Sequence, residues 1–178
     1  MTEETVVQLH IERLSHDGRG IGYLDGKIVF VDNALPGEDV ELEQRQKRKR
    51  FNEGRAINVL TPSPKRVAPA CEHFGVCGGC SLQHMDALRQ ITFKQQFLSE
   101  QLQHFGACEP EQWLAPLQGD SYGYRRKARI GVRFVEKKQK VLVGFREKNG
   151  RYLADINACP VLEPTFGLRI EAFEALIG

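Results

Sequence analysis

Three of the five cysteines are clustered in a short glycine-containing segment, and a fourth follows much later in the chain. The segment reads Cys71-Glu-His-Phe-Gly-Val-Cys77-Gly-Gly-Cys80, and Cys159 is followed by a proline. Glycines between thiolates let a loop curl so that backbone N–H groups face the sulfurs. Three clustered cysteines closed by a distant fourth is the pattern that holds many iron–sulfur clusters. We therefore predict that Cys71, Cys77, Cys80 and Cys159 bind a metal centre.

Four sulfur ligands suit either a [4Fe-4S] cluster or zinc. Structural zinc usually takes its ligands in two short-spaced pairs, so the three-plus-one spacing favours the cluster and leaves zinc as the alternative. A disulfide framework needs an oxidising compartment, and the acidic start of the chain lacks the positive region of a signal peptide. Cys108 has no partner motif and is expected to be an inert thiol, while His73 and His84 are expected to pack or hydrogen-bond around the loop.

Basic residues are concentrated in two segments although the net charge is only +2. Residues 120–151 hold eleven Lys and Arg against three Asp and Glu, an excess of +8, and residues 44–50 add five basic residues without an acid. Subtracting both from the total leaves −11 for the rest of the chain. A solvated face is the ordinary explanation of a single charge run, but this partition favours a polyanionic partner. The second run supplies the candidate contacts Arg45, Lys47, Arg48, Lys49 and Arg50.

The segment Tyr124–Phe134 is predicted to be a strand with one apolar and one cationic face. Its odd positions carry Arg125, Lys127, Arg129 and Arg133, and no acid occurs from residue 121 to 135. Side chains on one face of a strand repeat every ~6.6 Å, a spacing comparable to that of phosphates on an extended nucleic-acid strand. These four residues are therefore candidate RNA contacts, and the guanidinium of Arg129 could also stack on a base or bind its edge.

The elements before the cysteines are predicted to form a small antiparallel β-barrel. Alternation at 7–11, the turn dipeptide Asp25-Gly26 between 23–24 and 27–31, and runs at 40–42 and 56–60 give five short strands. The glycine-rich stretch 17–22 looks like a nucleotide-binding loop, but an alternating strand precedes it and another strand follows, so we assign it to a turn or strand bend.

After the barrel, the pattern predicts a linker and a second domain. Prolines mark residues 63–69 as the linker, apolar residues at helical spacing predict a helix over 86–105 with Asp86 as N-cap and Gly106 as C-terminal cap, and strands are expected at 124–135, 140–146 and 152–156. A further apolar stripe predicts a helix over 164–178. The expected fold is mainly β, with a barrel over 1–62 and a small α/β domain over 70–178; no membrane span is expected, and the location is expected to be cytoplasmic.

Taken together, these motifs resemble the N-terminal and central part of bacterial 23S ribosomal RNA (uracil-5-)-methyltransferases, in the branch that carries a TRAM domain. The resemblance follows the family's order along nearly the whole chain: Gly18-Arg-Gly-Ile-Gly22, Phe30-Val-Asp-Asn-Ala-Leu-Pro-Gly-Glu38, the cysteine segment with Ser-Leu-Gln-His84, Tyr124-Arg-Arg-Lys-Ala-Arg129, Gly144-Phe-Arg146 and Cys159-Pro-Val-Leu162.

The resemblance implies a TRAM barrel, a central domain with a [4Fe-4S] cluster on Cys71, Cys77, Cys80 and Cys159, and 23S ribosomal RNA as partner, without an obligate protein partner. It also implies a further domain that binds S-adenosylmethionine and supplies the catalytic cysteine and base. None of these catalytic residues matches this sequence, so the chain is expected to be an inactive fragment of the enzyme. Two alternatives stay open: a non-enzymatic RNA-binding module with structural zinc, and an iron–sulfur electron carrier.

Overall fold

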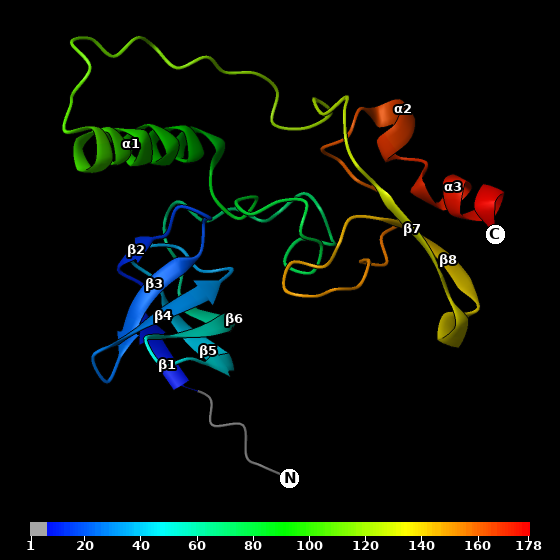
Figure 1. Cartoon of the computed structure of the whole chain (residues 1–178), viewed down its shortest axis with the longest axis horizontal. Helices are drawn as coiled ribbons and strands as arrows, with labels where there is room; N and C mark the ends of the chain where they lie inside the picture. Colours follow the sequence, from blue (N-terminus) through cyan, green and yellow to red (C-terminus); the bar gives the residue numbers. More distant parts are fainter. Residues whose placement is uncertain (1–6) are drawn as a thin grey trace. The chain divides into compact units, whose positions relative to one another are not determined.

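The computed structural model describes residues 7–178 and is mainly β-sheet with few helices (Figure 1). The chain forms two compact units. The first comprises the chain up to Ala68 together with His84–Gln101, and the second comprises Pro69–Gln83 and Leu102–Gly178. No helix in the described part of the chain is both long and apolar enough to cross a membrane.

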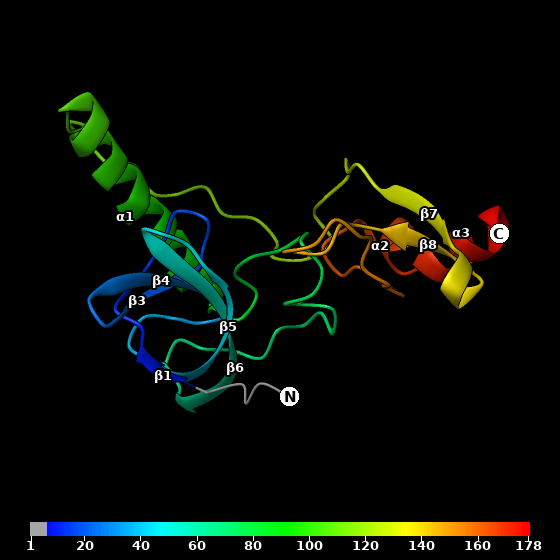
Figure 2. The ribbon, with the colours of Figure 1, turned by 60° about the horizontal axis from the view of Figure 1, so that its bottom comes forward.

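A six-stranded sheet makes up most of the first unit. Its order is β1-β5-β6-β4-β3-β2, antiparallel except for the β4–β6 pair. Figure 2 shows these strands from a second side. The five predicted strand regions are all present, and a two-residue strand is added to them. The bounds are β1 Val7–His10, β2 Arg13–Leu14, β3 Gly20–Leu24, β4 Lys27–Asp32, β5 Asp39–Lys47 and β6 Phe51–Thr61.

The sheet is not the closed barrel that the sequence predicts. β1 and β2 are its two edge strands, and no ladder joins them in the described residues. The short segment between them does bridge the sheet, because the Ile11 amide donates to the Glu38 carbonyl and the Glu12 amide donates to the Ile21 carbonyl, both at 2.9 Å. Two backbone hydrogen bonds from the segment between β1 and β2 therefore take the place of a continuous ladder.

The core of this unit lies on the inner face of the sheet and consists of aliphatic side chains: Leu9, Ile11, Val29, Val31, Ala34, Val40, Leu42 and Ala56. Gly22 lets β1 approach β3 closely, since a Cβ at this position would lie 2.4 Å from the His10 carbonyl oxygen. The glycine-rich loop of a dinucleotide-binding fold opens a helix. Here a strand, β3, begins at Gly20 instead. The assignment of residues 17–22 to a bend of the sheet is confirmed.

Two local predictions are also confirmed. Asp25 and Gly26 have φ values of 50° and 75° and join β3 to β4, as expected for a two-residue hairpin turn. Helix α1 (Ala87–Gly106) begins after Asp86, whose carboxylate accepts hydrogen bonds from the amides of Leu88 (3.1 Å) and Arg89 (3.2 Å). Gly106 is the last helical residue, and the left-handed position falls on Ala107 with φ of 47°.

The proline-rich stretch after β6 is tied to the first unit at its beginning. The carboxylate of Glu38 is fully buried and accepts hydrogen bonds from the amides of Leu35 (2.8 Å) and Ser63 (3.1 Å). Arg66 forms a two-pronged ion pair with the same carboxylate. Residues 63–66 are thus part of a packed arrangement.

The second unit contains a two-stranded hairpin and two short helices. β7 (Gly131–Val135) and β8 (Lys140–Gly144) are antiparallel and are joined by a 3-10 turn over Glu136–Lys138. The predicted C-terminal helix is divided into α2 (Pro164–Gly167) and α3 (Ile170–Ile177). Glu174 of α3 is buried, and its carboxylate accepts a hydrogen bond from the Val143 amide of β8 at 3.1 Å and pairs with Lys140 at 3.0 Å.

The predicted strand over 124–135 is only half present. Residues 126–130 are irregular, and Arg125 forms an isolated parallel bridge with Leu162. The amide of Arg125 donates to the Val161 carbonyl at 3.0 Å, and the Glu163 amide donates to the Arg125 carbonyl at 3.1 Å. Backbone partners at 161–163 thus hold the start of this segment. The predicted apolar face is not a core either, because Tyr124, Val132 and Phe134 are all more than half exposed.

Candidate metal centre and cationic segments

The four cysteines predicted to bind metal line one cavity in the second unit. Cys71, Cys77, Cys80 and Cys159 contribute to its wall together with His73, Phe145 and Arg125. Cys159 is buried, the other three are half-buried, and Cys108 is exposed and lies outside this cavity. The fold therefore brings together residues separated by about eighty positions.

The Cys-Gly-Gly-Cys loop lies directly against the segment that follows β8. The Gly78 amide donates to the Arg146 carbonyl and the Lys148 amide donates to the Val76 carbonyl, both at 2.8 Å. A Cβ on Gly78 would come within 2.9 Å of the Arg146 oxygen, which explains the absence of a side chain there. The Gly79 amide points at the Cys77 sulfur (3.4 Å), an arrangement that stabilises a thiolate ligand.

A polar clamp joins the loop to the residues before the fourth cysteine. His73 Nε2 lies 2.7 Å from Asn157 Oδ1, and the Asn157 side-chain amide donates to Glu72 at 2.7 Å. The Cys71 amide also donates to the Gln83 side chain at 3.2 Å. Sequence reasoning assigned a supporting role to His73 but missed Asn157 and Gln83, because no motif connects positions so far apart.

The pKa values of two thiols in the cavity are raised. Burial raises the pKa of Cys71 and Cys77, and the other cysteines of the group raise it further through electrostatic repulsion between thiolates. This repulsion is what a multiply charged cation relieves, so metal binding at this donor set would release protons.

In residues 7–178, no group of three or more His, Cys, Asp and Glu is arranged to hold a single metal ion.

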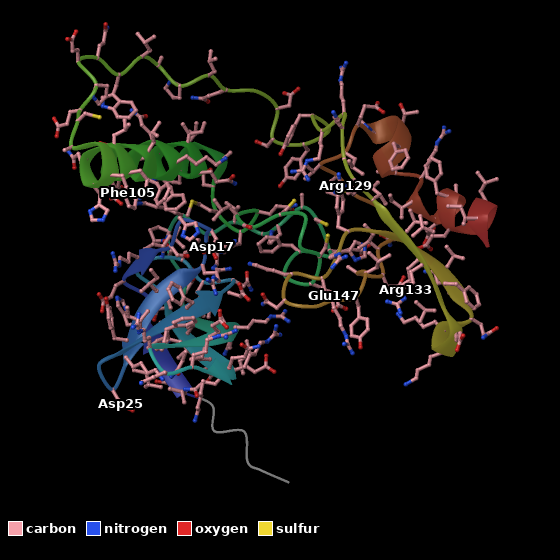
Figure 3. The ribbon with its side chains drawn as sticks, viewed as in Figure 1. Asp17, Asp25, Phe105, Arg129, Arg133 and Glu147 are labelled. Carbon is pink, nitrogen blue, oxygen red and sulfur yellow. The ribbon has the colours of Figure 1, made fainter. Side chains whose placement is uncertain are left out.

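The predicted cations of the second unit lie in and after the irregular segment. Lys127 and Arg129 precede β7 and Arg133 lies on it, all three being exposed, whereas Arg125 is half-buried. Figure 3 labels Arg129 and Arg133. A hollow of about 540 Å³ opens beside them and is lined by Arg125, Arg126, Ala128, Ile130, Leu162, Glu163 and Phe166. Alternation along the predicted strand would put Arg126 on the apolar face, opposite the four cations, which is wrong, because Arg126 is exposed and lines the hollow.

The predicted cations of the first unit lie on the β5–β6 hairpin. Arg45 and Lys47 belong to the end of β5, residues 48–50 form the turn, and all five side chains are exposed. Arg48 is held over the ring of Phe51 with its guanidinium carbon 5.7 Å from the ring centroid. The basic run is therefore accessible to a ligand.

Comparison with known proteins supports the resemblance seen in the motifs. The TRAM domain family matches residues 2–57. The chain is 53% identical over 174 residues to the 23S rRNA (uracil(1939)-C(5))-methyltransferase RlmD of Alcanivorax borkumensis, covering 98% of this chain and 39% of that protein. It is 54% identical over 168 residues to the protein of the same name from Nitrosococcus oceani, covering 94% and 38%.

A solved structure is also similar. The crystal structure of Pyrococcus abyssi tRNA (uracil-54, C5)-methyltransferase in complex with S-adenosyl-L-homocysteine matches with a TM-score of 0.56 and 27% identity, over 95% of this chain and 35% of that one. The chain spans about two fifths of the length of the curated relatives that it matches. On these grounds, the chain carries a TRAM domain and is similar over nearly its whole length to part of the 23S rRNA (uracil(1939)-C(5))-methyltransferases RlmD.

Proposed function

We propose that this chain is the RNA-binding and iron–sulfur part of an S-adenosylmethionine-dependent 23S rRNA (uracil-C5)-methyltransferase. The main support for this proposal is the cavity lined by four cysteines and Arg125, in a chain that matches RlmD proteins over almost its whole length. The relatives are named for methylation of a uracil in 23S rRNA, and the solved neighbour holds the demethylated product of the methyl donor. Methyl transfer itself is assigned to the rest of such a protein.

In this proposal, the exposed cations grip the RNA backbone. Arg125, Lys127, Arg129 and Arg133 of the second unit, and the basic run of the β5–β6 hairpin, supply the phosphate contacts. Each phosphate neutralised by a cation releases counterions, so the affinity falls steeply with salt. Small β-barrel modules of the oligonucleotide-binding (OB) class hold nucleic-acid strands in the same general way.

A binding measurement tests the RNA part. The chain should bind a 23S rRNA fragment containing the uridine for which the relatives are named, with an affinity that declines linearly on a logarithmic salt scale. Replacement of Arg125, Lys127 and Arg129 by Ala together should reduce the salt slope by roughly 2 to 3. Lys94→Ala on helix α1 removes one exposed positive charge elsewhere and should leave the slope unchanged. Absence of RNA binding at low salt would contradict the proposal.

The cysteines would hold a [4Fe-4S] cluster that ties the 71–80 loop to Cys159. The donor set fits, because four thiols face one cavity and the Gly79 amide points at the Cys77 sulfur. Its role in this chain is structural cross-linking of two segments distant in sequence. Anaerobic purification followed by iron, sulfide and zinc analysis tests this: iron and sulfide with visible absorbance are expected, and zinc alone would favour the RNA-binding zinc module.

Cysteine variants sharpen the metal assignment. Cys80→Ser and Cys159→Ser should each lose the visible absorbance and most of the iron. Cys108→Ser is the matched control, because Cys108 is exposed and outside the cavity, and it should keep both. Retention of iron by the Cys159 variant would show that the distant cysteine is not a ligand.

A further inference from the structure

The outer face of the first sheet carries two arginines stacked on two phenylalanines. Phe30 and Phe51 lie on neighbouring strands β4 and β6, alternate with the buried Val29 and Asn52, and remain partly exposed. Their rings meet edge to face at 5.5 Å and 86°. Arg19 lies over Phe30 with its guanidinium carbon 4.6 Å from the ring centroid, and Arg48 lies over Phe51 at 5.7 Å.

A single carboxylate positions both guanidinium groups. Glu53 Oε1 lies 3.0 Å from Arg19 Nη1, and Glu53 Oε2 lies 3.3 Å from Arg48 Nε. Asp17 adds a second contact to Arg19 at 2.8 Å. We call Arg19, Phe30, Arg48, Phe51 and Glu53 the arginine–phenylalanine platform.

The charges of this platform are balanced locally. Asp17 and Glu53 compensate the two guanidinium groups, so the platform together with Asp17 adds no net positive charge to the surface. It nevertheless stays accessible, because the Arg48 side chain is 54% exposed while its inner side rests on Phe51. The exposed guanidinium plane of Arg48, whose charge Glu53 compensates, can stack on a base as well as contact a phosphate.

We propose that the arginine–phenylalanine platform is a stacking site for unpaired RNA bases. Bases splayed out of single strands stack on aromatic rings and on guanidinium planes. The exposed cations Lys47, Lys49 and Arg50 adjoin Arg48 in the chain and can hold the backbone of the same strand. The inference deepens the proposed RNA binding and rests on it, and it assigns a ligand to Arg19, Phe30 and Phe51, which charge patterning had left without one.

The site should contribute affinity that depends on bases and not on salt. The probes are an oligouridylate of about ten nucleotides, within the usual site size of a single OB-like module, and a sugar–phosphate strand of the same length without bases. The unaltered chain should bind the base-bearing strand at least about fivefold more tightly. Phe51→Leu keeps an apolar side chain but removes the ring, and Arg48→Lys keeps the charge but removes the plane.

Both variants should lose most of this preference while their binding to the abasic strand and their salt slope stay unchanged. Arg13→Lys is the matched control, because Arg13 is exposed on β2 outside the basic run and no ring contact of Arg13 is found in residues 7–178; it should behave like the unaltered chain. Thermal unfolding shows whether each variant folds. If Phe51→Leu does not fold, the comparison of Arg48→Lys with the control tests the stacking site by itself.

The outcomes separate this inference from the broader function. Equal binding of base-bearing and abasic strands by the unaltered chain, or equal behaviour of Arg48→Lys and Arg13→Lys, overturns the stacking site and leaves RNA binding standing. Failure of the unaltered chain to bind either strand at low salt overturns the proposed function and the stacking site together.

Discussion

Arg66 forms a two-pronged ion pair with Glu38 inside the first unit. Its Nε lies 2.6 Å from Glu38 Oε1 and its Nη2 lies 2.8 Å from Oε2, while Nη2 also donates to the Asn33 carbonyl at 2.9 Å. Glu38 is fully buried and Arg66 is only 18% exposed. The pair fastens the end of β6 and the start of the following stretch to the loop before β5.

Removal of the arginine should therefore destabilise the first unit strongly. Arg66→Met leaves a buried carboxylate without its cation, which costs about 3–5 kcal/mol of unfolding free energy. Urea unfolding followed by circular dichroism measures the change. Arg13→Met, at an exposed position of β2, is the control and should shift stability by less than about 0.5 kcal/mol. Equal effects of both changes would show that the ion pair carries little stability.

The same pair predicts the acid sensitivity of the fold. Burial alone would raise the pKa of Glu38, but hydrogen bonds from Arg66 and the Leu35 and Ser63 amides outweigh it and hold the pKa below its usual value of 4.5. A lowered folded-state pKa gives stability that is present above pH 4.5 and is lost as the pH falls through the folded value.

Unfolding free energies measured from pH 6 to about pH 3 should thus decline on acidification in the unaltered chain. Glu38→Gln should be less stable at neutral pH but should lose less on acidification. Glu12→Gln, at an exposed position, should retain the full decline. A Glu38→Gln curve parallel to that of the unaltered chain would assign the acid sensitivity to other carboxylates.

The close approach of β1 to β3 should make Gly22 intolerant of any side chain. A Cβ on Gly22 would lie 2.4 Å from the His10 carbonyl oxygen, so Gly22→Ala should cost about 1–3 kcal/mol through overpacking. Gly119→Ala is matched to it, because nothing lies within 4 Å of a Cβ there, and should be neutral. The two variants are compared by thermal unfolding, and a neutral Gly22→Ala would mean that β1 can move away at little cost.

The clamp between His73 and Asn157 should govern how firmly the proposed metal centre is held. Groups that orient the segments around metal ligands typically affect metal retention by about 10- to 100-fold. His73→Ala should accordingly accelerate iron loss to a chelator by at least about tenfold. His104→Ala near the end of helix α1 should not change the rate, and equal rates for both variants would assign no role to the clamp.

Local chemistry made much of the fold predictable. The Asp25-Gly26 turn and the Asp86 cap depend on residues adjacent in the chain, and both are present as expected. The pairing of Glu38 with Arg66 could not be foreseen, because the partners are 28 positions apart and prolines between them indicate a linker. Residues 126–130 alternate like a strand, yet the structure leaves them irregular because the backbone of Arg125 pairs instead with 161–163.

The candidate site was likewise predictable where it depends on residue type and spacing, and not where it depends on strand pairing. Cysteine types and spacing identified the residues that share a cavity, since thiol chemistry restricts what such a cluster can do. The arginine–phenylalanine platform was not predicted, because stacking depends on which strands become neighbours. Phe30 and Phe51 meet only through the β4–β6 pairing, which is the one parallel pair of the described sheet.

The contact between Glu174 and Val143 determines which edge of the β7–β8 hairpin is open to pairing with another strand. A strand at the edge of a sheet exposes unpaired amides that invite another chain to pair with it. The outward-facing Val143 amide of β8 is already bonded to the Glu174 carboxylate, and helix α3 lies against this strand. Helix α3 thus covers the edge of β8 and protects it from pairing with another chain. The edge of β7 is the one at which a further strand would extend this sheet.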